Sequence, residues 1–208
     1  MPRLAVAERR RMLVTAAARV MARDGIAQTT TRAITAEAGM PRGSFHYCFR
    51  SKDELLQELI RVVVSDMVHA AEAAHVDDRS LTENLQAGLR AMWESVIEHP
   101  DEQLVTYELT TYALRDETRP HLARWQYENY YGQAINYLTF VARSEAIEWS
   151  LPMPVVARLL VTVVDGLSLN WLADRDSEAA LGVIDAVATH LANLAASVDP
   201  ILTESGAR

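Results

Sequence analysis

The sequence predicts an all-α fold, in which an N-terminal three-helix helix-turn-helix domain continues through a long fourth helix into a C-terminal helical bundle. About nine helices are expected in total. Apolar residues recur with the helical period along nearly the whole chain, and no stretch alternates with a period of two for long enough to form a sheet. Glycine, proline and hydroxyl residues stand where these helices should begin and end.

The first helix is expected over about residues 6–24. Its apolar side follows the spacing i, i+3, i+4, i+7 and i+8, and consists of Leu13, Ala16, Ala17, Val20 and Met21. Gly25 stands directly after this stretch, where a glycine commonly ends a helix because it adopts the left-handed conformation at little cost. We expect the stripe to form part of the core of a small N-terminal domain.

Two short helices follow, separated by a glycine turn. Thr29 and Thr30 offer hydroxyl caps for the second helix, and Gly39 supplies the tight turn after it. Pro41 suits the first turn of the third helix, which is expected to reach about Cys48. We assign the apolar side chains of this region to the core; they are Ile34, Phe45 and Phe49.

A capping box starts the long fourth helix. Ser51 is expected to accept a hydrogen bond from the amide of Glu54, and the Glu54 carboxylate to accept one from the amide of Ser51. Five later helices are expected at about 81–98, 101–114, 119–142, 154–173 and 177–197. Their apolar patterns predict a helical bundle.

Charge is distributed unevenly along the chain. The net charge is −8, which taken alone argues against a nucleic-acid partner. Residues 1–56, however, hold ten basic and five acidic residues and carry +5, whereas the remainder carries −13. This division indicates a basic module that contacts a polyanion and an acidic body that does not.

Two short helices joined by a glycine turn, with a longer helix before and after them, present one short helix to the major groove of DNA. The segment from Thr30 to Leu56 closely resembles the DNA-binding signature of the TetR (tetracycline-repressor) family, and the resemblance is strong over about residues 7–67. It implies a helix-turn-helix DNA-binding domain at 1–52 and a ligand-binding and dimerisation domain at 53–208. The function that it implies is a sequence-specific transcriptional regulator, expected to be a repressor.

The resemblance also implies which residues face DNA. Arginine can bridge guanine O6 and N7, hydroxyl groups bind phosphate, and a lysine at a helix N-terminus favours an anion. The predicted DNA-binding residues are Thr30, Thr31, Arg32, Arg42, Gly43, Ser44, His46, Tyr47 and Lys52. For Arg42, Tyr47 and Lys52 the alternative is a merely solvated surface.

Two departures from the family pattern affect this prediction. Pro41 stands where relatives usually have a hydroxyl residue, so side-chain capping is lost there and the phosphate contact of that hydroxyl does not carry over from relatives. His46 replaces the usual tyrosine, and its charge would vary with pH beside a phosphate. Operator preference therefore does not follow from relatives.

The last two expected helices are more apolar than a surface position requires. Both carry wide apolar faces, and the polar turn Asp174-Arg175-Asp176 joins them. Such a pair can complete its burial against its own copy, so a homodimer through about residues 154–197 is expected. The alternative is that both helices are buried within one chain.

Aromatic residues concentrate in the acidic body and predict an apolar ligand cavity with polar tips. The preferred ligand-binding residues lie on the central helices; they are Trp93, Tyr107, Tyr112, Trp125 and Tyr130. The alternative for each of these residues, and the commoner role of aromatic residues at helical spacing, is ordinary core packing. The resemblance implies that an unknown apolar or aromatic small molecule moves the fourth helix, changes the spacing of the two recognition helices and releases the DNA.

An enzyme is the competing class, and a helical small-molecule-binding protein without specific DNA binding is a further alternative. The sequence has no phosphate-cradling glycine loop, two-histidine zinc motif or nucleophile elbow, and no metal or cofactor is expected. The run from His99 to Glu102 looks reactive, but proline followed by two acids is typical of a helix start.

Compartment and membrane association follow from composition. The single cysteine, Cys48, gives no sign of an oxidising compartment, so the cytoplasm is expected. We expect Cys48 either to pack in the domain or to lie on a partly exposed surface, and a redox-sensing role is the weaker alternative. The most apolar stretch, 155–172, is interrupted by Arg158, Asp165 and Asn170, so no membrane partner is expected.

Overall fold

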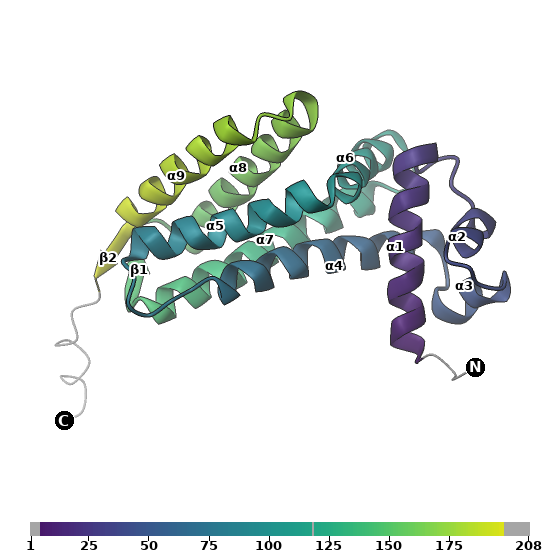
Figure 1. The fold of residues 1–208 in the computed structure, drawn as a ribbon, viewed down its shortest axis with the longest axis horizontal. Coiled ribbons are helices and arrows are strands. Elements are labelled where there is room, and N and C mark those ends of the chain that lie inside the picture. The colour runs from purple at the N-terminus through teal and green to yellow at the C-terminus, as the bar shows by residue number, and fades with distance from the viewer. Residues whose placement is uncertain (1–4, 118, 198–208) are drawn as a thin grey trace. The chain divides into compact units, whose positions relative to one another are not determined.

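The computed structural model describes residues 5–117 and 119–197 of the 208-residue chain (Figure 1). Nine helices and two short strands lie within these residues, which confirms the all-α fold. The helices are α1 (Val6–Asp24), α2 (Thr31–Glu37), α3 (Gly43–Cys48), α4 (Lys52–Ala73), α5 (Leu81–Glu98), α6 (Pro100–Arg115), α7 (Pro120–Ser144), α8 (Met153–Asp174) and α9 (Ser177–Asn193). The strands are β1 (Ile147–Trp149) and β2 (Ala195–Ser197).

The described residues form two compact units. The first comprises the chain up to Asp66 together with Ser95–Tyr130, and the second comprises Met67–Glu94 together with the chain from Tyr131 onward. The first unit extends beyond the predicted domain of residues 1–52, because α1 packs against α6 as well as against α2 and α3. The functional division at residue 52 stays a prediction.

The core of the first unit forms where the apolar period places it. The predicted stripe of α1 is buried along its whole length, and Ile34, Phe45 and Phe49 are at most 1% exposed. Leu55, Leu56, Leu59 and Ile60 of α4 are completely buried in the same unit. Sequence periodicity therefore identified the core of this unit correctly.

The turns around α2 follow the predicted residue types. Gly25 and Gly39 have positive φ values of 81° and 64°, and the Thr30 hydroxyl accepts a hydrogen bond from the amide of Ala33 at 3.1 Å. The expected start of the third helix was wrong: α3 begins at Gly43, and Pro41 lies before it. The amide of Ser44 bonds back to the Pro41 carbonyl at 2.9 Å, so a tighter turn precedes the helix.

One of the two hydrogen bonds predicted for the capping box at α4 is present. The amide of Glu54 donates to the Ser51 hydroxyl at 3.1 Å, as expected. The Glu54 carboxylate instead accepts from the amide of Arg50 at 2.8 Å, one residue earlier than Ser51. Glu54 also lies 3.3 Å from the Arg10 guanidinium of α1, so the carboxylate joins the helix start to a neighbouring helix.

The C-terminal helical prediction was wrong at its end. The helix expected to reach Ser197 stops at Asn193, and β2 then pairs antiparallel with β1, with Trp149 opposite Ala195. The polar turn between α8 and α9 is confirmed: Arg175 has a left-handed φ of 59°, and the Asp176 side chain caps α9 by accepting from the amide of Ala179.

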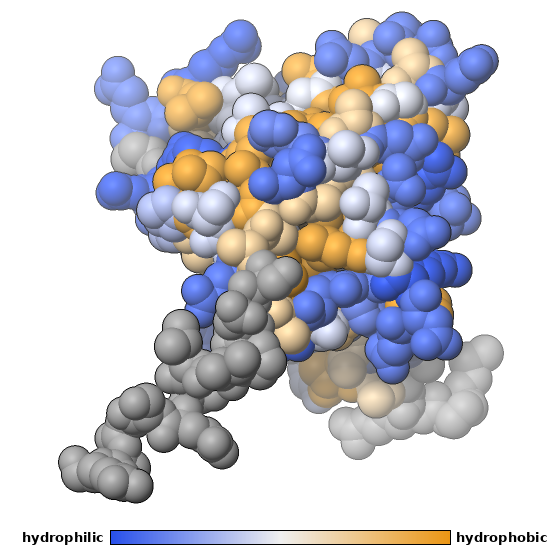
Figure 2. Space-filling model, turned by 90° about the vertical axis from the view of Figure 1, so that its left-hand side faces the viewer, coloured by the Kyte–Doolittle hydropathy of each residue, from blue (hydrophilic) through white to orange (hydrophobic). Residues whose placement is uncertain are grey.

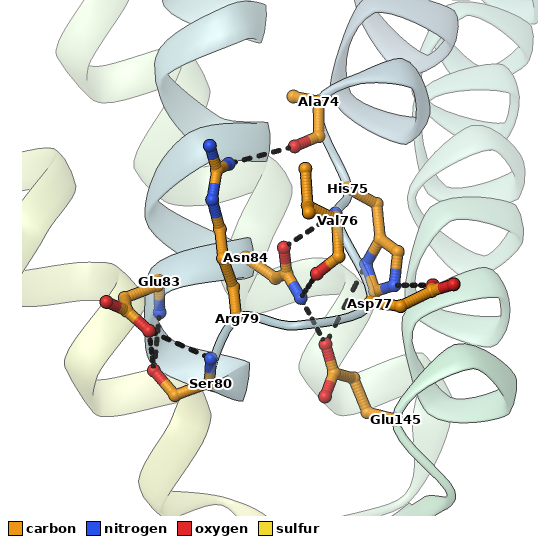
Figure 3. Close-up of polar contacts among 9 residues, drawn as sticks. All are labelled: Ala74, His75, Val76, Asp77, Arg79, Ser80, Glu83, Asn84 and Glu145. Atoms are coloured by element: carbon orange, nitrogen blue, oxygen red, sulfur yellow. Dashed lines mark hydrogen bonds and ion pairs between the residues drawn. The ribbon is translucent and has the colours of Figure 1, made fainter.

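A polar cluster fixes the connection between α4 and α5 in the second unit (Figure 3). The buried Asn84 side chain exchanges two 3.0 Å hydrogen bonds with the backbone of Val76 and donates to Glu145 at 2.7 Å. His75 lies between carboxylates, 3.6 Å from Asp77 and 3.7 Å from Glu145. Because Glu145 directly follows α7, the cluster ties this connection to the end of α7.

Gly88 of α5 allows a close approach between helices of the second unit. A Cβ atom at this position would lie 2.2 Å from the hydroxyl of Tyr137, which belongs to α7. Tyr137 is 1% exposed, and burial, reinforced by Glu72, raises the pKa of its hydroxyl. The glycine is therefore required by the neutral phenol that occupies the space beside it.

Apolar side chains also reach the surface of the second unit. Figure 2 looks toward the end that carries β1 and β2 and shows apolar residues between hydrophilic ones. Val155 and Leu169 of α8 and Val183 of α9 are 50%, 53% and 44% exposed. Among the described helices, α8 alone is long and apolar enough to cross a membrane by length and composition, a test that a core helix also passes.

Candidate nucleic-acid interface

Helix α3 has two faces of opposite character. Phe45 and Cys48 are buried together with Phe49 at its end, whereas Arg42, Gly43, His46 and Tyr47 are exposed. The buried residues recur every three to four positions, so packing of one face turns the other face outward. Tyr47 is 60% exposed despite its size, which leaves its ring and hydroxyl available to a partner.

The start of α2 lies next to α3 in the same unit. Thr30 and Arg32 are exposed and Thr31 is half-buried. The Thr30 hydroxyl accepts from the amide of Ala33 and keeps its own proton to donate. Ser44 of α3 is also half-buried. The structure thus brings eight of the nine predicted DNA-binding residues onto α2 and α3 or next to them.

Lys52 is placed differently from the other predicted residues. Its ammonium donates to the carbonyls of Ile26 and Thr29, in the connection between α1 and α2. Burial, reinforced by the nearby Arg119 charge, lowers the pKa of Lys52. Two of the three N–H bonds of the ammonium are therefore engaged within the protein, and its predicted DNA contact stays a prediction.

Two arginines of α1 belong to this region and were not among the predicted site residues. The Arg9 guanidinium lies 5.6 Å from the centre of the Tyr47 ring. Arg10 turns inward: it lies 4.3 Å from the Phe49 ring and donates to the Cys48 carbonyl at 2.5 Å. The run of three arginines at 9–11 was visible in the sequence, but only the fold shows that Arg9 and Arg10 contact α3.

His46 and Cys48 occupy opposite sides of α3. The exposed His46 ring meets Phe45 edge to face, with centroids 5.4 Å apart. The Cys48 thiol is free, and the residue is 6% exposed, so it packs in the core as expected. His46 is thus the one of the two that lies on the surface of the predicted interface.

The predicted ligand-binding aromatics divide between the two units. Tyr107 and Tyr112 of α6 and Trp125 and Tyr130 of α7 belong to the first unit, and Trp93 of α5 belongs to the second. Their role in ligand binding stays a prediction.

Three of the four predicted ligand-binding aromatics of the first unit lie beside polar groups. Arg119 donates to the Tyr112 hydroxyl at 2.6 Å, and the Arg61 guanidinium lies 5.1 Å from the Trp125 ring centre. The buried Gln126 side chain donates to the Tyr130 hydroxyl at 2.7 Å and to the Thr106 carbonyl at 3.0 Å. These contacts fix the orientation of the aromatic side chains that project from α6 and α7.

Trp93 is 3% exposed and meets Trp171 edge to face at 5.6 Å. Its indole N–H has no hydrogen-bond acceptor among the described residues. A buried donor without an acceptor is costly to the folded state. The Trp93 N–H is therefore an unpaired donor within the core of the second unit.

Comparisons with known proteins agree with this geometry. Residues 13–59 match the family model described as bacterial regulatory proteins, tetR family. Over 176 residues the chain is 28% identical to the HTH-type nicotine-responsive transcriptional repressor HdnoR of Paenarthrobacter nicotinovorans, an alignment that covers 83% of this chain and 88% of the relative.

Solved structures share the fold. A TetR-family transcriptional regulator from Rhodococcus sp. superposes with a TM-score of 0.74 at 20% identity, covering 89% of this chain and 98% of its own. The regulator FadR of Bacillus subtilis, solved in complex with stearoyl-CoA, superposes with a TM-score of 0.67 at 17% identity, covering 88% and 97%. Residues 13–59 of this chain therefore match the tetR family of bacterial regulatory proteins, and the chain shares the fold of these solved regulators.

Proposed function

We propose that this DNA-binding transcriptional regulator is a repressor that binds operator DNA as a homodimer and leaves it when a small molecule binds. The observation that carries the proposal is the outward face of α3, with Arg42, His46 and Tyr47 exposed beside the start of α2. Arginine at this place suits guanine, and the tyrosine hydroxyl suits a phosphate. We place the protein in the cytoplasm, where its DNA lies.

The exposed apolar residues of α8 and α9 support the homodimer. Val155, Leu169 and Val183 remain 44–53% exposed in the single chain, and burying them against a second copy is favourable. Two copies present two recognition helices, which need a spacing of about 34 Å to enter successive major grooves. We assign α8 to this interface and to no membrane.

The ligand is an organic small molecule with an apolar or aromatic body. Aromatic side chains on α6 and α7 of the first unit and the unpaired Trp93 indole of the second unit support this class. The relative from Paenarthrobacter nicotinovorans is described as nicotine-responsive, and the Bacillus subtilis structure holds stearoyl-CoA. These two differ so much in size that they do not narrow the class further.

Selection of bound sequences from a random duplex library at two salt concentrations tests the proposal. We expect the native protein to enrich a near-palindrome, and the double variant Arg42→Ala, Tyr47→Phe to lose that enrichment, because loss of a bidentate arginine costs about 1–3 kcal/mol per half-site. Arg124→Ala is the matched control, since this exposed arginine of α7 pairs with Glu128 on the same helix. Failure of the native protein to enrich any motif at either salt contradicts the proposal and favours a helical binding protein or an enzyme.

A further inference from the structure

The backbone N–H and C=O groups of Ile26, just after α1, are held by two charged side chains from two different helices. The amide of Ile26 donates to the Glu108 carboxylate of α6 at 2.6 Å. The carbonyl of Ile26 accepts from the Lys52 ammonium at the start of α4. The Ile26 side chain is fully buried. We call the three residues Ile26, Lys52 and Glu108 the Ile26 clasp.

The clasp lies at the point where the chain leaves α1 for the helix-turn-helix. The buried Thr29 donates from its hydroxyl to the Gly25 carbonyl at 2.8 Å, and α2 follows with Thr30 as its cap. This connection is therefore compact, and few residues separate the clasp from the recognition helices. A displacement at Ile26 passes directly to α2 and, through the glycine turn, to α3.

A second connection joins the same two helices. Asp53, adjacent to Lys52, lies 3.6 Å from the Arg119 guanidinium, which donates to the Tyr112 hydroxyl at 2.6 Å. Tyr112 stands four residues after Glu108 on α6, and positions i and i+4 share one face of a helix. One face of α6 is thus linked to two consecutive residues at the start of α4. Glu108 is linked to Lys52 through Ile26, and Tyr112 is linked to Asp53 through Arg119.

We propose that Glu108 is a positioning residue for DNA binding, which holds α2 and α3 in the orientation that fits the operator. Lys52 binds the carbonyl of the same residue, so its ammonium acts on α2 and α3 through Ile26. Because Tyr112 lies on the face of α6 that carries Glu108, a ligand that contacts Tyr112 and shifts α6 acts on the recognition helices through the clasp. This proposal rests on the proposed function and specifies how its DNA site is regulated.

Operator affinity and its salt dependence separate positioning from direct contact. Glu108→Ala leaves the Ile26 amide without its charged acceptor, and we expect binding to the selected operator to weaken about tenfold, or about 1.4 kcal/mol. The slope of log K against log salt should not change, because no phosphate contact is lost. Affinity for random duplex DNA should also stay unchanged, since the exposed basic residues remain.

Two further variants complete the design. Glu108→Gln keeps an oxygen that accepts from the Ile26 amide, so it should restore most of the affinity lost in Glu108→Ala. Glu128→Ala is the control, because Glu128 is an exposed carboxylate of the same unit and pairs with Arg124 on its own helix. Operator affinity in Glu108→Ala equal to that in Glu128→Ala overturns the proposal. A reduced salt slope also overturns it, because that result identifies a direct phosphate contact.

Amide hydrogen exchange tests the clasp without DNA. The Ile26 amide should be protected in the native protein and exchange faster in Glu108→Ala, while α5 and α9 keep their protection. An unprotected Ile26 amide in the native protein overturns the clasp whatever the operator result. A protected amide in a protein that selects no operator overturns the proposed function instead. A loss of protection throughout Glu108→Ala identifies global destabilisation and also contradicts a positioning role.

Discussion

Helices α3 and α8 both leave side chains exposed, but the exposed groups differ in chemistry. The outer face of α3 presents Arg42, His46 and Tyr47, whereas α8 presents Val155 and Leu169. A charged or hydroxylated face is well solvated, so leaving it exposed between binding events costs little free energy. An apolar face gains about 25 cal/mol for every Å² removed from water, which favours permanent burial. The contrast indicates a reversible partner for α3 and a constant partner for α8.

The largest effect is expected from placing a charged side chain, like those exposed on α3, on the exposed apolar face of α8. Leu169→Arg places a charge on the exposed apolar face, and we expect the proposed homodimer to dissociate because an unpaired charge cannot be buried there. Operator affinity should fall by about 10²–10⁴, since a monomer loses the second half-site. Light scattering measures the mass and a binding titration measures the affinity.

Leu114→Arg is the control for this change, because Leu114 is a 73% exposed leucine of α6, outside α8 and α9. If Leu169→Arg stays dimeric at the concentrations at which the native protein is dimeric, the assignment of α8 to the interface is wrong.

A smaller effect is expected at the edge of the α3 face. Arg9→Ala removes the guanidinium that lies over the Tyr47 ring. If Arg9 adds a phosphate contact to this face, the salt slope of operator binding should fall by about 0.9 per half-site. Arg11→Ala is the matched control, since the Arg11 side chain is 72% exposed and pairs with Glu8 on its own helix. An equal slope in the two variants would limit the DNA face to α2 and α3.

The smallest effect is expected at the Glu102 carboxyl, which lies on neither α3 nor α8. Burial raises the pKa of the Glu102 carboxyl. The nearby charge of His99 lowers this pKa, and those of Asp66 and Asp101 raise it further. A raised pKa in the folded state stabilises the protein fully below the unfolded value near 4.5, and that contribution is lost as pH rises through the folded pKa. Glu102→Gln should therefore raise the free energy of unfolding at pH 7, by at most about 1 kcal/mol.

Thermal unfolding at pH 4 and pH 7 measures this change, with Glu128→Gln as the exposed control. The gain should shrink toward pH 4, where the native carboxyl becomes protonated. A gain that is the same at both pH values would show that Glu102 stabilises or destabilises through packing alone.

Sequence reasoning predicted the features that depend on neighbouring residues. The first helix, its glycine end, the Thr30 cap and the buried face of α3 are all local patterns, and the structure has them where they were expected. The regulator class followed from the same segment, because Thr30–Leu56 carries a family signature as well as a helical pattern. The three-residue strands were not predicted, since Ile147–Trp149 and Ala195–Ser197 are too short to show a period.

The hydrogen-bond partners of charged side chains could not be predicted from the sequence either. The Glu54 carboxylate accepts from the amide of Arg50 and not from that of Ser51, and the Lys52 ammonium donates to a carbonyl of the α1–α2 connection. These choices depend on residues far away in the chain, such as Glu108, which lies 82 positions from Ile26. No local pattern carries that information, so the Ile26 clasp became visible only in the folded protein.

Gly88 has a consequence for how this protein can be engineered. Alanine is favoured over glycine within helices by about 1 kcal/mol, so a stability screen guided by helix propensity would select Gly88→Ala first. At this position the new methyl group would meet the Tyr137 hydroxyl at 2.2 Å, so the buried Tyr137 side chain or the helix backbone would have to move. A saturation library should instead find residues larger than glycine at 88 only when position 137 loses its hydroxyl, so the two sites must be varied together.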